Sequence, residues 1–160
     1  MHTDLWDFAI ELYARPGVEA ACLALQAEDA DVCLLLCGVW LDSRQTALTE
    51  ERVETLRQFS GPWQRDVVQP LRSIRKQWRA NAASDAQLAT LREQIKALEL
   101  NAERLQLERL QAFCENWPDR KTAQPESWLT RLTPAAIRHH DALQVLRAAM
   151  RDSQEAEVGD

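Results

Sequence analysis

The sequence predicts an all-α protein. Its 160 residues include only four glycines and six prolines, and helix formers such as Ala, Leu, Gln, Glu and Arg are abundant, so long helices with short connections are expected. Apolar residues recur at spacings of three and four, and no stretch alternates as a half-buried strand does. We expect residues 1–152 to form one domain, an irregular bundle of about seven or eight helices with one long helix and one kinked basic helix. Residues 153–160 are expected to be a disordered acidic tail.

Three helices are expected in the first third. Asp4 can cap a helix over residues 5–13, which ends at Arg15-Pro16-Gly17, and a second helix follows over residues 18–26. The run from Val32 to Leu41 is apolar all round and is therefore predicted to be the central helix. The acidic cluster before it, residues 28–31, suits the start of that helix, where carboxylates cap free N–H groups and favour the positive end of the helix dipole.

The middle of the chain contains two proline signals. A helix beginning at Thr49 is expected to stop at Ser60-Gly61-Pro62. The next helix begins at Trp63 and contains Pro70, which predicts a bend near Gln69.

Residues 85–117 are the longest periodic run and predict the long helix. Its apolar positions are Leu88, Leu91, Ile95, Leu98, Ala102 and Leu105. Because the phase shifts after about two heptads, packing inside a bundle is favoured over a free parallel dimer. A weak homodimer through residues 88–117 remains an alternative.

The last quarter predicts a polar loop over residues 119–124 and a helical turn around residues 127–129. The final helix is expected to begin at Thr133-Pro134, which combines an N-cap with a first-turn proline.

Charge is unevenly distributed. The net charge of −6 argues against a duplex nucleic-acid binder with a general basic field. Residues 1–60 carry eleven acidic and four basic side chains, whereas residues 61–81 carry one acidic and five basic. An arginine-rich helix face could bind phosphate or an acidic protein helix; alternatively, its arginines pair with the acidic N-terminal third of the same molecule or form a solvated helix face. The predicted partner-binding residues are Trp63, Arg72, Arg75, Lys76, Trp78, Arg79 and Trp128.

Other chemistry is weakly supported. The four cysteines, Cys22, Cys33, Cys37 and Cys114, are expected to be reduced, and no metal site is predicted because zinc would need ligands converging from several helices. His139 and His140 are adjacent and so point about 100° apart on a helix. Phosphate-loop and nucleophile-elbow motifs are lacking, and the cluster at residues 28–31 has no second acidic motif to hold magnesium diphosphate with it. No catalytic residues or cofactor are predicted, and an enzyme is not favoured.

The N-terminus lacks the basic and apolar regions of a secretory signal, and the longest apolar run is about half the length needed to cross a bilayer. A cytoplasmic protein with no membrane contact is expected.

The opening segment carries a family resemblance. Leu5-Trp6-Asp7-Phe8-Ala9, Leu12-Tyr13, Pro16-Gly17-Val18, Ala21-Cys22-Leu23, Leu25-Gln26, Asp31-Val32, Leu34-Leu35-Leu36 and Trp40-Leu41 make up the pattern. It resembles the proteobacterial family DUF2390, most densely over residues 5–41. The resemblance implies a bacterial, cytosolic protein and transfers no functional residues.

These observations favour a non-enzymatic interaction or adaptor protein that binds another macromolecule through its basic, tryptophan-containing helix face. The expected partner is a protein; RNA or another anionic ligand is less favoured. The alternative is a small-molecule-binding protein or enzyme with a pocket between helices near residues 28–31.

Overall fold

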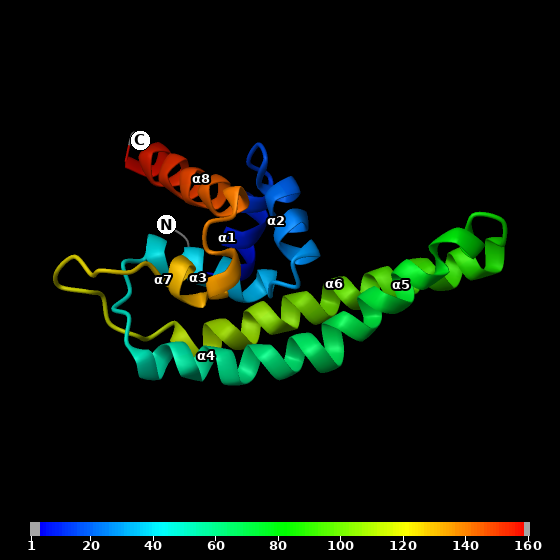
Figure 1. Ribbon diagram of the computed structural model, residues 1–160, viewed down its shortest axis with the longest axis horizontal. Helices are drawn as coiled ribbons and strands as arrows, with labels where there is room; N and C mark the ends of the chain where they lie inside the picture. Colours follow the sequence, from blue (N-terminus) through cyan, green and yellow to red (C-terminus); the bar gives the residue numbers. More distant parts are fainter. Residues whose placement is uncertain (1–3, 159–160) are drawn as a thin grey trace.

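The computed structural model describes residues 4–158, apart from the side chains of residue 153 and residues 155–158. This part of the chain is all-α, as predicted, and its only strand-like feature is an isolated bridge between Thr46 and Asp119. A helical body carries one projecting pair of helices (Figure 1). The elements are α1 (Leu5–Tyr13), α2 (Val18–Ala27), α3 (Val32–Ser43), α4 (Glu50–Trp63), η1 (Gln64–Val68), α5 (Gln69–Ala82), α6 (Ala86–Cys114), α7 (Trp128–Leu132), η2 (Ala135–Ile137) and α8 (Asp141–Val158).

The helix starts follow the sequence closely. The Asp4 carboxylate accepts hydrogen bonds from the first turn of α1, and Asp31 and Thr49 cap α3 and α4 in the same way. The predicted capping role of the acidic cluster is therefore confirmed at Asp31.

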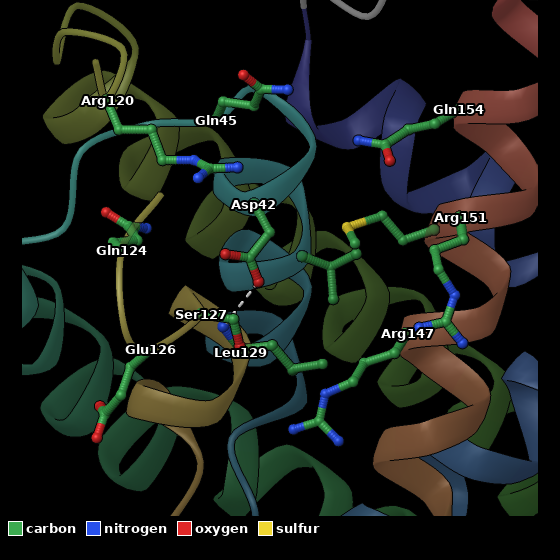
Figure 2. Close-up of a pocket in the computed structure, with 12 residues that line it drawn as sticks. Asp42, Gln45, Arg120, Gln124, Glu126, Ser127, Leu129, Arg147, Arg151 and Gln154 are labelled. Carbon is green, nitrogen blue, oxygen red and sulfur yellow. Dashed lines mark hydrogen bonds between the residues drawn. The ribbon is translucent and has the colours of Figure 1, made fainter. Parts of the chain in front are cut away.

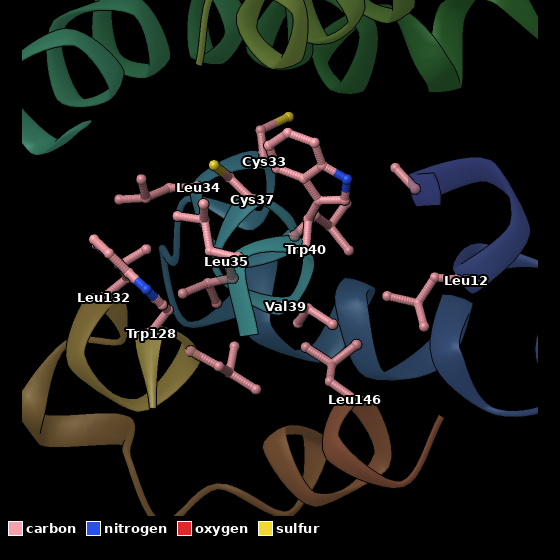
Figure 3. Packing of buried hydrophobic residues seen from close by; sticks show 14 of the residues in the cluster. Leu12, Cys33, Leu34, Leu35, Cys37, Val39, Trp40, Trp128, Leu132 and Leu146 are labelled. Carbon is pink, nitrogen blue, oxygen red and sulfur yellow. The ribbon is translucent and has the colours of Figure 1, made fainter. Parts of the chain in front are cut away.

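Helix α3 is the centre of the body. Every residue from position 33 to 41 is buried, including Trp40 at 0% exposure, which confirms the predicted central helix. Side chains of α1, α7 and α8 surround it (Figure 3). Gly38 allows close approach of α7, since a Cβ atom there would lie 3.3 Å from the Leu129 backbone.

The predicted helix end at Ser60-Gly61-Pro62 is wrong. Helix α4 passes through Pro62 to Trp63 and continues directly into η1, a five-residue π-helix. The wide π-helical turn, in which Gln69 N donates to Gln64 O, is followed by Pro70 in the first turn of α5, where a missing N–H is tolerated. The irregularity predicted near Gln69 is this π-helix.

Helices α5 and α6 form the projecting pair, called here the α5–α6 hairpin. Helix α5 has no buried residue, and the two helices extend together beyond the body (Figure 1). The Asp85 carboxylate caps α6 at the tip. The hairpin therefore presents much of its surface to solvent.

The C-terminal part differs from the prediction in two places. Thr133-Pro134 introduces only the short 3₁₀ turn η2, and α8 begins at Asp141, where the His140 ring accepts a hydrogen bond from Ala142 N. A proline can open either an α-helix or a 3₁₀ helix. Thr133-Pro134 therefore marks the start of the turn η2, whereas α8 begins later, at Asp141. Helix α8 also continues over residues 153–158, within the expected disordered tail, whereas residues 159–160 lie outside the described part.

Candidate functional site

The predicted basic face is largely paired inside the molecule. Arg75 Nε lies 2.6 Å from Glu99 Oε1, and Arg72 contacts Glu99 and Glu103 at 3.4 Å each. Glu99 is 7% exposed, so these contacts join α5 to α6 with little access to solvent. Only Lys76 and Arg79 of the predicted basic residues are exposed. The arginines pair within the molecule, as the alternative held, but with acids of α6 rather than of the N-terminal third.

The predicted partner-binding residues do not share one surface. Trp128 is fully buried, stacks on Trp117 at 5.7 Å and donates to Thr46 O at 2.9 Å, so the expectation that it faces a partner is wrong. Arg72 and Lys76 both line a cavity of about 230 Å³ between α5 and the body. Trp78 is two residues beyond Lys76, hence about 200° around the helix, and lies on the side away from that cavity.

An exposed row of leucines on α6 was not recognised as a separate surface in the sequence. Leu91, Leu98 and Leu105 are spaced seven apart and are 50%, 52% and 43% exposed. The other half of the same pattern, Leu88, Ile95 and Ala102, is partly or fully buried. The expected packing inside a bundle therefore holds for Leu88, Ile95 and Ala102. Leu91, Leu98 and Leu105, called here the leucine row, remain about half exposed.

The leucine row lies on the side of the hairpin away from the body. Leu100 lines a pocket on the body side, and Leu98 is two residues earlier, about 200° around α6. By the same geometry Trp78 lies on the side of the leucine row. The two helices thus present apolar side chains on a common outer side.

An aromatic cluster lies where this side meets the body. Trp63 donates from Nε1 to Ala102 O at 3.0 Å, and the Arg109 guanidinium lies 4.5 Å above its ring. Phe59 contacts both Trp63 and Phe113, and Phe113 is 46% exposed. Of the predicted residues, the structure thus places Trp63 and Trp78 beside apolar surface.

A second candidate site is an apolar pocket of about 290 Å³ between α1, α2, α3 and α6. Ile10, Tyr13, Leu23 and Leu100 line it and are each more than a third exposed. The polar groups facing it are Gln26, Gln64, Arg72 and Glu103, and burial raises the pKa of Glu103. A mostly apolar cavity with a few polar groups is the usual form of a small-molecule site.

The acidic cluster lies beside the apolar pocket without lining it. The Asp31 carboxylate accepts from Ser60 Oγ at 2.6 Å and from Gln106 Nε2 at 3.0 Å, which connects α3 to α4 and α6. Burial raises the pKa of Asp31, although these hydrogen bonds oppose the shift. Asp31 therefore joins helices, and Gln26, Val32 and Cys33 are the neighbouring residues that reach the pocket.

Two cysteine thiols line the same pocket. Burial raises the pKa of Cys22 to about 12 and that of Cys33 well above its usual value. The thiolate is the nucleophilic form of cysteine, so these side chains supply apolar surface at neutral pH rather than a reactive group.

The apolar pocket and most of the hairpin fall within one region of sequence similarity. The family model described as "Protein of unknown function (DUF2390)" matches residues 4–110, well over half of the chain. The chain belongs to the DUF2390 family. No curated protein and no solved structure matches it.

In this DUF2390 chain the matched region includes the leucine row and every residue lining the apolar pocket. Within the described residues, no three His, Cys, Asp or Glu side chains are grouped as metal ligands. No helix of the described part has the length and apolar character that crossing a membrane requires.

Proposed function

We propose that this protein is a helical interaction protein whose α5–α6 hairpin binds an amphipathic helix of another protein along the leucine row. The observation that carries the proposal is the seven-residue spacing of three half-exposed leucines on one side of a projecting hairpin. A partner helix packed beside α5 and α6 would bury the leucine row, the side of α6 that α5 does not cover.

The residues around the leucine row suit an apolar helix. Gln87, Gln94 and Asn101 are exposed, uncharged neighbours of the row along α6, so a partner would not have to remove a charge from water at these positions. The half-exposed aromatic cluster lies toward the body and offers large side chains of the kind that dominate interface energies. Partner choice then depends mainly on apolar shape rather than on the basic residues of α5.

Two leucines of α6 provide a matched test. Leu98 and Leu100 are 52% and 55% exposed and lie on opposite sides of the helix. A photo-crosslinking amino acid is placed at Gln94, beside the row, and the protein is irradiated in a bacterial lysate. We expect a discrete heterologous crosslink that Leu98→Gln reduces at least about fivefold, since a central apolar anchor of a helix interface contributes 1 kcal/mol or more.

The control variant Leu100→Gln should leave that crosslink within about twofold, because its side chain faces the body. Equal loss in both variants would contradict the proposal. So would a crosslink only between copies of this chain, which sedimentation would register as a dimer depending on Leu98.

A small-molecule function is favoured by a different observation, the apolar pocket. Its lining and its volume of about 290 Å³ fit a compact ligand with an apolar body and one polar end, which Gln26 and Arg72 would contact.

The same pair of variants separates the two functions. Binding of an apolar fluorescent dye, or a ligand retained in native mass spectrometry, should be weakened by Leu100→Gln and not by Leu98→Gln; the reverse result would count against the pocket.

A further inference from the structure

A third pocket, distinct from the cavity beside α5 and from the apolar pocket, is bordered by three arginines. It has a volume of about 290 Å³ and lies between the end of α3, the loop before α7, and α8. In Figure 2, Arg120 extends toward Asp42 from one side, and Arg147 and Arg151 lie on the α8 side. It is called here the arginine pocket. Its polar residues are Asp42, Gln45, Arg120, Gln124, Glu126, Ser127, Arg147, Arg151 and Gln154, and Val39, Leu129 and Met150 form its apolar part.

The loop that carries Arg120 is fixed where it passes the pocket. Arg120 N donates to Gln45 O at 2.7 Å, and Ala47 N donates to Pro118 O at 3.0 Å. Gln124 Oε1 accepts from Leu48 N at 3.0 Å, which leaves the Gln124 amide NH₂ available as a donor. A site whose backbone is already ordered loses little entropy when a ligand binds.

The acidic groups of the pocket are already engaged. Asp42 accepts from Trp128 N at 2.7 Å and from Leu129 N at 3.0 Å. Glu126 Oε2 lies 3.9 Å from the Arg131 guanidinium, which is outside the pocket. In the described structure neither carboxylate accepts a hydrogen bond from the three arginines, although the charges of Arg147 and Arg120 oppose the rise in the pKa of Asp42 that burial causes.

The guanidinium groups of the three arginines have few hydrogen-bond partners in the described structure. Arg147 donates to Thr130 Oγ1 at 2.6 Å, and within the described residues the side chains of Arg120 and Arg151 make no hydrogen bond. The three guanidinium charges that line the pocket exceed the two carboxylate charges of Asp42 and Glu126, which leaves an excess of one positive charge in a chain whose net charge is −6.

We propose that the arginine pocket binds a small phosphorylated metabolite. A phosphate monoester carries a charge of about −1.5 to −2 at neutral pH and three strong acceptor oxygens, and the Arg120 and Arg151 side chains, which make no hydrogen bond in the described structure, can donate to several of these oxygens at once. Guanidinium groups match phosphate oxygens in geometry and cannot lose their charge. Gln124, Gln45 and Ser127 offer hydrogen bonds to hydroxyl or carbonyl groups of the rest of the ligand, and the volume limits it to a small molecule.

Calorimetric titration of the full chain tests this proposal with glycerol phosphate as the probe, and with inorganic phosphate, acetate and chloride at matched ionic strength. We expect saturable binding of glycerol phosphate and weaker binding of inorganic phosphate, which makes no contact through a carbon skeleton. Arg120→Gln and Arg151→Gln should each weaken binding by about tenfold, as expected for loss of a hydrogen bond to a charged group.

Arg65→Gln is the matched control, because Arg65 is exposed, pairs with its neighbour Asp66 within the described residues and does not line the arginine pocket; the affinity of this variant should stay within about twofold of that of the native chain. Neither the Arg120 nor the Arg151 side chain makes a hydrogen bond in the described structure, and an unchanged melting temperature confirms that each variant is folded. The proposal is overturned if millimolar glycerol phosphate gives no saturable heat, if acetate binds equally well, or if the Arg120→Gln/Arg151→Gln double variant binds like the native chain.

Discussion

Hydrogen bonding and burial act in opposite directions on the ionised Asp31 carboxylate. This carboxylate caps α3 and accepts hydrogen bonds from Ser60 and Gln106, yet it lies where burial raises its pKa. Gln106 Oε1 has no hydrogen-bond partner in the described structure. A protonated or amide group at position 31 could donate to this oxygen after rotation of the Gln106 amide, so the site accepts a neutral residue.

The pH dependence of stability follows from the direction of this shift. Because the pKa of Asp31 is higher in the folded than in the unfolded chain, the folded state holds the proton longer, and Asp31 lowers stability as pH rises from about 4 through the raised value. The free energy of unfolding of Asp31→Asn, relative to that of the native chain, should therefore increase between about pH 4 and neutral pH. Urea unfolding across this range measures it.

Asp29→Asn is the control for that series, since Asp29 is exposed, and its difference from the native chain should not follow the same trend. A relative stability of Asp31→Asn that falls with rising pH would show that the hydrogen bonds outweigh burial.

Trp128 shows how much one buried indole can connect. It packs against Trp117 and its N–H reaches Thr46 O. Trp128→Phe should lower the free energy of unfolding by about 1–3 kcal/mol, because the Thr46 carbonyl loses its donor and the stacked pair loses area. Denaturant unfolding checks this, with Trp78→Phe on the half-exposed hairpin as the milder control; equal losses would contradict the assignment.

The capping carboxylates could be predicted from the sequence because a cap depends on residues within one turn. The burial of Trp128 could not, because Glu126 and Ser127 before it are polar and its two long-range hydrogen bonds join it to Asp42 and Thr46, more than 80 residues earlier.

Among the elements, two helical glycines differ in what surrounds them. A Cβ atom at Gly61 in α4 would meet nothing within 4 Å, whereas one at Gly38 in α3 would lie 3.3 Å from the backbone of α7. Gly61→Ala should stabilise the fold by about 0.5–1 kcal/mol through reduced entropy of the unfolded chain. Gly38→Ala should destabilise it by about 1–3 kcal/mol because α7 must shift. Thermal unfolding of both variants tests the pair, and a change of the same sign in both would contradict the packing described.

The periodic residues of α6 predicted a long helix correctly, but not which half of the pattern would be covered. Leu88 and Leu91 look equivalent in the sequence; only the position of α5 distinguishes them. The same applies to Pro62, which lies inside α4 and is followed directly by the π-helix η1, so the proline alone did not indicate whether the helix ends. The local sequence predicts that a helix forms, whereas the elements packed against the helix determine which of its faces are buried.

The basic residues of α5 show a related limit. Arg72 and Arg75 stand out in the sequence as a positive cluster, but their partners Glu99 and Glu103 come 24 to 31 residues later. The arginine pocket was missed for the same reason, since Arg120 and Arg147 belong to different elements and meet only in the folded chain.

At the scale of the whole molecule, the hairpin and the body differ in burial. Helix α5 has no buried residue, and α3 has nine in succession. Local opening should therefore be easier in the hairpin. Amide hydrogen exchange should be fastest near the tip, around residues 78–90, and slowest in α3. Equal protection in both regions would contradict this and would indicate that the hairpin is covered in solution.

The two regions also differ in when their contacts can form during synthesis. The hairpin joins segments that follow each other directly, so it can fold as soon as α6 has left the ribosome. The body cannot, because Asp42 finds its backbone donor at Trp128, 86 residues further along the chain. Until then α3, the most apolar helix, lacks the cover that α7 and α8 provide. A nascent chain arrested before Trp128 should therefore be a strong substrate for chaperones that bind apolar segments.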